Sequence, residues 1–121
     1  MKKRILVIDD EESYAEVLKI NLEDTDRYEV EIALDAPSGF KKLQGGHFDL
    51  VLLDILLPKI EGHEALAQIK KIAPVPIIIM SSYLTPQQRS LIVQAGAESS
   101  FLKLDSFEKI HDEIMRVLGE A

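Results

Sequence analysis

The chain has 121 residues, of which 46% are hydrophobic, which is enough for one domain with a single apolar core and argues against disorder. Its formal net charge of −7 argues against nonspecific binding to nucleic acid or anionic lipid, because such binding depends on lysine and arginine. It contains no cysteine, which excludes disulfides, thiolate metal sites and thiol nucleophiles.

Short apolar runs predict five strands, and each is followed by a segment with helical features. In chain order the predicted elements are a strand at Ile5–Ile8, a helix around Tyr14–Leu22, a strand at Val30–Leu34, a short helix within Asp35–Gly46, a strand at Leu50–Leu53, a helix around Leu66–Ile72, a strand at Ile77–Met80, a helix that begins after Thr85 and ends at Gly96, a strand at Phe101–Leu102 and a helix over Phe107–Leu118. The first apolar run stops at Asp9, too early for a signal peptide, and no other run could span a membrane. The sequence therefore predicts a soluble, cytoplasmic protein.

The clearest local signal is the start of the fourth helix. Thr85 is a good N-cap, Pro86 suits the first helical position, and Gln88 can close a capping box. Most of the predicted strands are continuously apolar, as in parallel strands that are covered on both faces. Alternating strands and helices with short loops predict one α/β domain over residues 1–121 with right-handed crossovers.

Polar side chains follow four of the predicted strands. Asp9 and Asp10 come after the first strand, Asp54 after the third, Ser81 after the fourth and Lys103 after the fifth. Ligands of open parallel sheets bind at the carboxyl ends of the strands. Carboxylates that meet there repel one another unless a cation balances them, and Mg²⁺ prefers oxygen ligands. An aspartate beside such a metal and a lysine can attack a phosphoryl group and become an acyl phosphate.

The whole chain resembles the receiver domain of bacterial two-component response regulators. The matching residues are Val7–Glu11, Asp49–Asp54, Pro58, Gly62, Ile78–Ser81, Gly96, Ala97 and Lys103. The resemblance implies a flavodoxin-like (βα)5 fold, which is a three-layer sandwich around a parallel five-stranded sheet of order 2-1-3-4-5. It also implies a phosphorylation-dependent signalling switch. Such a domain is not an enzyme in the usual sense, because it catalyses only its own phosphorylation and dephosphorylation.

The resemblance further implies a Mg²⁺ site. Asp10 corresponds to a direct metal ligand, and Asp9 to an acidic residue that holds metal-bound water. Asp54 and the backbone carbonyl of Leu56 correspond to the remaining protein ligands. Mg²⁺ is therefore the expected cofactor.

Asp54 corresponds to the phosphoacceptor for a sensor histidine kinase or a phosphotransfer protein. Ser81 corresponds to the switch hydroxyl that turns toward the phosphoryl group, and Lys103 to the lysine that pairs with it. The responding face, which would contact an output domain or a partner, is expected over Thr85–Ala95 and Asp105–Leu118. No direct binding of nucleic acid or membrane by this domain is expected.

Two positions depart from the family pattern. Leu104 follows Lys103 where the family usually has a proline in a cis peptide, and we expect a trans bond because a non-proline cis bond costs about 3–4 kcal/mol. Ser100 stands where the family often has an aromatic switch residue, and Phe101, one residue later in a strand, should face the opposite side of the sheet.

Two rival functions stay open. A module with this fold that binds partners without phosphorylation would bind equally well after Asp54→Asn. A phosphohydrolase with an aspartyl nucleophile typically has a second aspartate two residues later, where this chain has Leu56. Apolar Leu56 and bulky Tyr83 are expected to slow or redirect hydrolysis of an acyl phosphate, because these positions influence the access of water.

Overall fold

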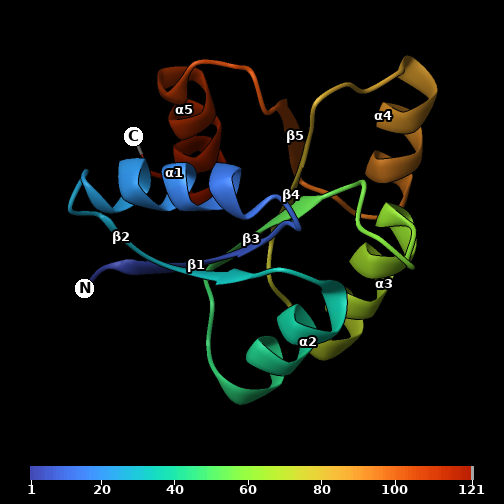
Figure 1. The fold of residues 1–121 in the computed structure, drawn as a ribbon, viewed down its shortest axis with the longest axis horizontal. Coiled ribbons are helices and arrows are strands. Elements are labelled where there is room, and N and C mark those ends of the chain that lie inside the picture. The colour runs from blue at the N-terminus through green and yellow to red at the C-terminus, as the bar shows by residue number, and fades with distance from the viewer. Residues whose placement is uncertain (121) are drawn as a thin grey trace.

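The computed structural model describes residues 1–120 and forms one sheet of parallel strands with helices on both faces (Figure 1). The elements are β1 Lys3–Ile8, α1 Glu12–Glu23, β2 Tyr28–Ala33, α2 Ala36–Gly45, β3 Leu50–Asp54, α3 Gly62–Ile72, β4 Ile77–Ser81, α4 Pro86–Gln94, β5 Ser99–Leu102 and α5 Phe107–Leu118. The strand order is β2-β1-β3-β4-β5 and every neighbouring pair is parallel. This architecture confirms the predicted flavodoxin-like fold and its sheet order.

Two apolar clusters fill the space between the sheet and its helices. Along β1, Ile5 and Val7 pack against α1 and α5, whereas Leu6 and Ile8 pack on the other side with α2, α3 and α4. Figure 1 shows α1 and α5 above the sheet and α2 and α3 below it. Because successive side chains point to opposite faces, a strand that is covered on both sides needs apolar residues at every position. Burial of the strands on both faces therefore explains the continuous apolar runs in the sequence.

The predicted cap of α4 is present. Thr85 Oγ1 accepts a hydrogen bond from the Gln88 backbone N–H at 3.0 Å, and the Gln88 side chain accepts one from the Thr85 N–H at 2.9 Å. Gly96 follows the helix with φ of +104°, in the region that favours glycine. At the weaker α2, Asp35 is the N-cap and accepts a hydrogen bond from the Ser38 N–H at 2.8 Å. Both helices therefore begin where side chains satisfy their free N–H groups.

The parallel register aligns the carboxyl ends of the strands. Ile8 pairs with Leu53, Asp54 with Met80, and Ser81 with Leu102. The residues that end these strands, or follow them, therefore lie along one edge of the sheet. No helix within residues 1–120 is long and apolar enough to cross a membrane.

Candidate functional site

Four polar side chains are buried at the carboxyl edge of the sheet. Asp54 and Ser81 are the last residues of β3 and β4, whereas Asp9 and Lys103 directly follow β1 and β5. Apart from Tyr28, they are the polar side chains that are buried within residues 1–120. Polar groups are costly to bury without partners, so their grouping at one edge marks a site where their charges compensate one another.

The ammonium group of Lys103 lies at the centre of this site. Its Nζ donates hydrogen bonds to Glu11 Oε1 at 2.5 Å and to Asp54 Oδ2 at 3.1 Å. Asp9 Oδ2 lies 2.8 Å from Nζ, and the two groups form an ion pair. The ring of Tyr14 faces the same ammonium, with 4.9 Å between Nζ and the ring centroid. Three carboxylates and one aromatic ring thus surround the lysine.

Burial and charge shift the pKa values at this site. Burial raises the pKa of Asp9 from its ordinary value of 3.8 to about 6, although Lys103 and the Glu11 N–H act to lower it. Burial alone would lower the pKa of Lys103, but the surrounding carboxylates outweigh burial and raise that pKa above its ordinary range. Burial also raises the pKa of Tyr14 to about 12. At neutral pH the lysine is therefore charged, and Asp9 is ionised against the cost of its burial.

The Asp54 carboxylate is held through both of its oxygens. Oδ1 accepts a hydrogen bond from the Leu56 backbone N–H at 2.9 Å, and Oδ2 accepts one from Lys103. The Ile55 N–H donates to the Met80 carbonyl at 3.2 Å, which ties the loop after β3 to β4. Only 3% of Asp54 is exposed, whereas Leu56 beside it is 65% exposed. The carboxylate is therefore buried in a fixed orientation, two residues before an exposed apolar side chain.

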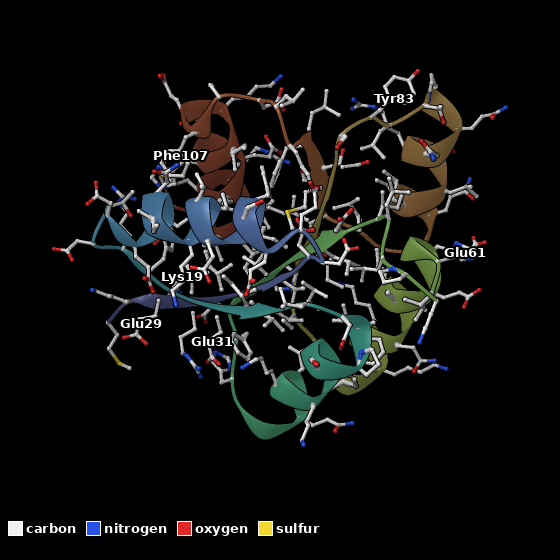
Figure 2. All side chains as sticks on the ribbon, viewed as in Figure 1. Lys19, Glu29, Glu31, Glu61, Tyr83 and Phe107 are labelled. Carbon is white, nitrogen blue, oxygen red and sulfur yellow. The ribbon has the colours of Figure 1, made fainter. Side chains whose placement is uncertain are left out.

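The hydroxyl of Ser81 is engaged by its own loop. It donates a hydrogen bond to the Tyr83 carbonyl at 2.9 Å and accepts one from the Tyr83 N–H at 3.3 Å. The Ser81 carbonyl accepts a hydrogen bond from the Lys103 N–H at 2.8 Å. Figure 2 shows Tyr83 on the loop between β4 and α4, and 69% of this residue is exposed. Because a hydroxyl has one proton to donate, a hydrogen bond from Ser81 to an acceptor on Asp54 requires its bond to the Tyr83 carbonyl to break.

The donor set suits a hard divalent cation. Carboxylate oxygens of Asp9, Glu11 and Asp54 all lie within 4.8 Å of one another, and no other group of this kind occurs within residues 1–120. With the charge of Lys103 the three carboxylates leave a formal charge of −2. Asp9 Oδ2 is buried without a hydrogen bond, so it retains an acceptor for a metal or its water. These features fit Mg²⁺.

Comparison with known proteins identifies the family of this domain. A family model described as "Response regulator receiver domain" matches residues 5–115. The chain belongs to the receiver domain family. Among curated relatives, it is 32% identical over its whole length to the alkaline phosphatase synthesis transcriptional regulatory protein PhoP of Bacillus subtilis, of which it covers 50%. It is 30% identical over 95% of its length to the response regulator ArlR of Staphylococcus saprophyticus, of which it covers 52%.

Solved structures show the same fold. A CheY-like response regulator receiver domain protein from Methanospirillum hungatei is 32% identical, with a TM-score of 0.91 over 98% of this chain and 95% of that one. A response regulator from Burkholderia pseudomallei, solved with a phosphorylated aspartic acid, a calcium ion and citrate, is 25% identical, with a TM-score of 0.85 over 96% of this chain and 66% of that one. This receiver domain spans about half the length of the curated relatives described above.

Both departures from the family pattern can be located in this receiver domain. Within residues 1–120 no peptide bond is cis, so the predicted trans bond between Lys103 and Leu104 is confirmed. Leu104 is 91% exposed, and the lysine ammonium nevertheless points into the acidic cluster. Phe101 is buried in the apolar cluster on the side of α1 and α5, whereas Leu102, the next residue of β5, packs against the cluster on the opposite side. Both Ser100 and Phe101 line a groove between α4 and α5. Neighbouring residues of β5 thus face opposite sides of the sheet, as expected for Phe101, and the face that the Ser100 side chain occupies stays a prediction.

Sequence reasoning brought the correct strand ends together but missed Glu11. Its carboxylate contacts Lys103 and belongs to the close acidic group, whereas Asp10 is exposed and lies outside that group. In the sequence Glu11 precedes the predicted first helix, where an acidic residue favours the helix dipole and need not take part in a site. The roles of Asp10 and of the Leu56 carbonyl as metal ligands stay predictions.

Proposed function

We propose that this receiver domain accepts a phosphoryl group on Asp54 from a sensor histidine kinase or a phosphotransfer protein. The observation that carries the proposal is the setting of the Asp54 carboxylate, which is buried at a strand end, oriented by the Leu56 N–H and paired with Lys103. The phosphorylated aspartate in the related Burkholderia structure supports the same assignment.

In the proposed reaction an Asp54 carboxylate oxygen attacks the phosphorus atom of a phosphohistidine. An O–P bond forms, the P–N bond breaks, and the leaving imidazole nitrogen keeps the electron pair and takes up a proton. Lys103, already 3.1 Å from Asp54 Oδ2, can neutralise charge on the transferring phosphoryl oxygens. The Leu56 N–H holds the carboxylate in one orientation, which lowers the entropy cost of the attack.

Mg²⁺ is part of the proposal. Asp9, Asp54 and Glu11 are the residues that the cluster offers as ligands or as acceptors for metal-bound water, with Asp10 beside them. When bound, the ion would screen the carboxylates from the incoming phosphoryl group and polarise its oxygens. The acidic composition of the cluster supports this assignment.

Signal output is proposed to follow from the added charge. A phosphoryl group brings negative charge and acceptor oxygens beside Ser81 and Lys103, which favours release of the Ser81 hydroxyl from Tyr83. The loop after Ser81 leads directly into α4, so residues Thr85–Ala95 and Asp105–Leu118 are the proposed responding face. Curated relatives about twice as long support an output domain or a partner as its target. A cytoplasmic location stays a prediction.

The intact mass of the protein tests the assignment. Wild type and Asp54→Asn are incubated with acetyl phosphate, with and without Mg²⁺. We expect one Mg²⁺-dependent phosphoryl adduct on wild type and none on Asp54→Asn, whose amide is a poor nucleophile. A matched Asp49→Asn variant removes a carboxylate at the opposite end of β3 and should label like wild type. Wild type that stays unlabelled under these conditions contradicts the proposal and favours an interaction module that works without phosphorylation.

A further inference from the structure

We propose that Glu11 is a latch that holds Lys103 in the unphosphorylated protein and releases it when a phosphoryl group arrives. The inference rests on the proposed function of Asp54 and adds a positioning residue that acts through the lysine. Its starting point is the side chain of Glu11, which reaches Lys103 Nζ at 2.5 Å across 92 residues of sequence.

The ammonium group of Lys103 is already surrounded by three carboxylates. It carries three N–H groups, and carboxylate oxygens of Glu11, Asp54 and Asp9 lie 2.5, 3.1 and 2.8 Å from its nitrogen. The centroid of the Tyr14 ring lies 4.9 Å from the same nitrogen. A phosphoryl oxygen on Asp54 must therefore compete with these carboxylates for the lysine.

Glu11 is the carboxylate that can be given up at the least cost. The side chains of Asp9 and, before the transfer, Asp54 hold carboxylates that are 0% and 4% exposed, and a buried carboxylate that loses its cation is strongly destabilising. The Glu11 side chain is 58% exposed, so water can replace the lysine around its carboxylate. The lysine can thus exchange Glu11 for a phosphoryl oxygen while keeping its contact with Asp9.

The backbone of Glu11 is held by hydrogen bonds, whereas its side chain makes no capping hydrogen bond. Its N–H donates to Asp9 Oδ1 at 2.9 Å, and its carbonyl accepts from the Ala15 N–H at 3.1 Å. Glu11 is the N-cap residue of α1, yet its side chain makes no capping hydrogen bond. The Glu11 carboxylate can therefore leave the lysine by side-chain rotation while the backbone stays in place. Helix α1 loses no capping hydrogen bond when this happens.

The test compares wild type, Glu11→Gln and Glu12→Gln. Glutamine keeps the size of the side chain and removes its charge. Glu12 is the matched control, because it is exposed at the first position of α1 and Lys103 makes no ion pair with it. The initial rate of Asp54 labelling by acetyl phosphate is measured at a Mg²⁺ concentration shown by titration to saturate each variant. Nuclear magnetic resonance of the Tyr14 ring reports the position of the nearby ammonium.

We expect Glu11→Gln to label about twofold to fivefold faster than Glu12→Gln, the range that corresponds to loss of one exposed ion pair. The Tyr14 ring resonances should shift in Glu11→Gln and stay in place in Glu12→Gln. Equal rates in the two variants would show a general effect of charge and overturn the latch, as would a slower rate in Glu11→Gln. If wild type itself is not labelled, the proposed function fails and the latch fails with it, which is a different result from equal rates in labelled proteins.

Discussion

Replacement of Asp9 with asparagine should stabilise the metal-free protein at neutral pH. The carboxylate of Asp9 is fully buried, and its pKa is raised from 3.8 to about 6 despite the nearby lysine. Each pKa unit corresponds to about 1.4 kcal/mol, so ionisation of Asp9 disfavours the folded state by about 3 kcal/mol relative to the unfolded chain. Asparagine places no charge there, and its amide NH₂ next to the lysine lowers the gain to about 1–3 kcal/mol.

The dependence on pH has a definite sign. Because the folded state binds the proton more tightly, the stability that protonated Asp9 contributes is fully present below pH 3.8 and is lost as the pH rises to about 6. The advantage of Asp9→Asn over wild type should therefore be small near pH 4 and largest at pH 7. Bound Mg²⁺ supplies the missing positive charge, so it should stabilise wild type more than the variant.

Urea denaturation in EDTA, followed by circular dichroism at several pH values, measures this difference. Asp10→Asn is the matched control, because Asp10 is the neighbouring aspartate and is exposed, and we expect a change within about 0.5 kcal/mol. The reasoning is refuted if Asp9→Asn lowers the free energy of unfolding at pH 7, or if its advantage is the same at pH 4 and pH 7.

Other variants probe the surroundings of the site. Gly62→Ala should lower the free energy of unfolding by about 1–3 kcal/mol, because the new β-carbon would lie 2.4 Å from Ile55 Cγ1. Gly45→Ala is the control, since its β-carbon would have no atom within 4 Å and should not lower the free energy of unfolding. Equal urea midpoints for the two variants would contradict this prediction. Thr85→Ala should cost about 1 kcal/mol through loss of the capping box, and an unchanged midpoint would show that the cap adds nothing. Leu56→Asn should shorten the half-life of phosphorylated protein by admitting water, and an unchanged half-life would reject that role.

Most residues of the site, but not all of them, could be predicted from the local sequence. Asp9, Asp54, Ser81 and Lys103 could be assigned to one edge because each ends or follows an apolar run, and parallel strands place such ends together. No pattern in the sequence predicted the contact between Lys103 and Glu11. It depends on the direction in which the chain leaves β1 and enters α1, and side-chain directions at such a turn follow from packing.

The sequence by itself determined which segments are strands and helices, because burial on both faces demands unbroken apolar runs and the start of α4 carries its own cap. It did not determine the order of the strands except through the family resemblance, since an apolar run that fits one neighbour fits another equally well. Only the tertiary structure decided that Glu11, and not Asp10, joins Lys103. The physical reason is that a buried ammonium takes the carboxylates within its reach, and that reach is set by the packing of α1 and β5 around the sheet.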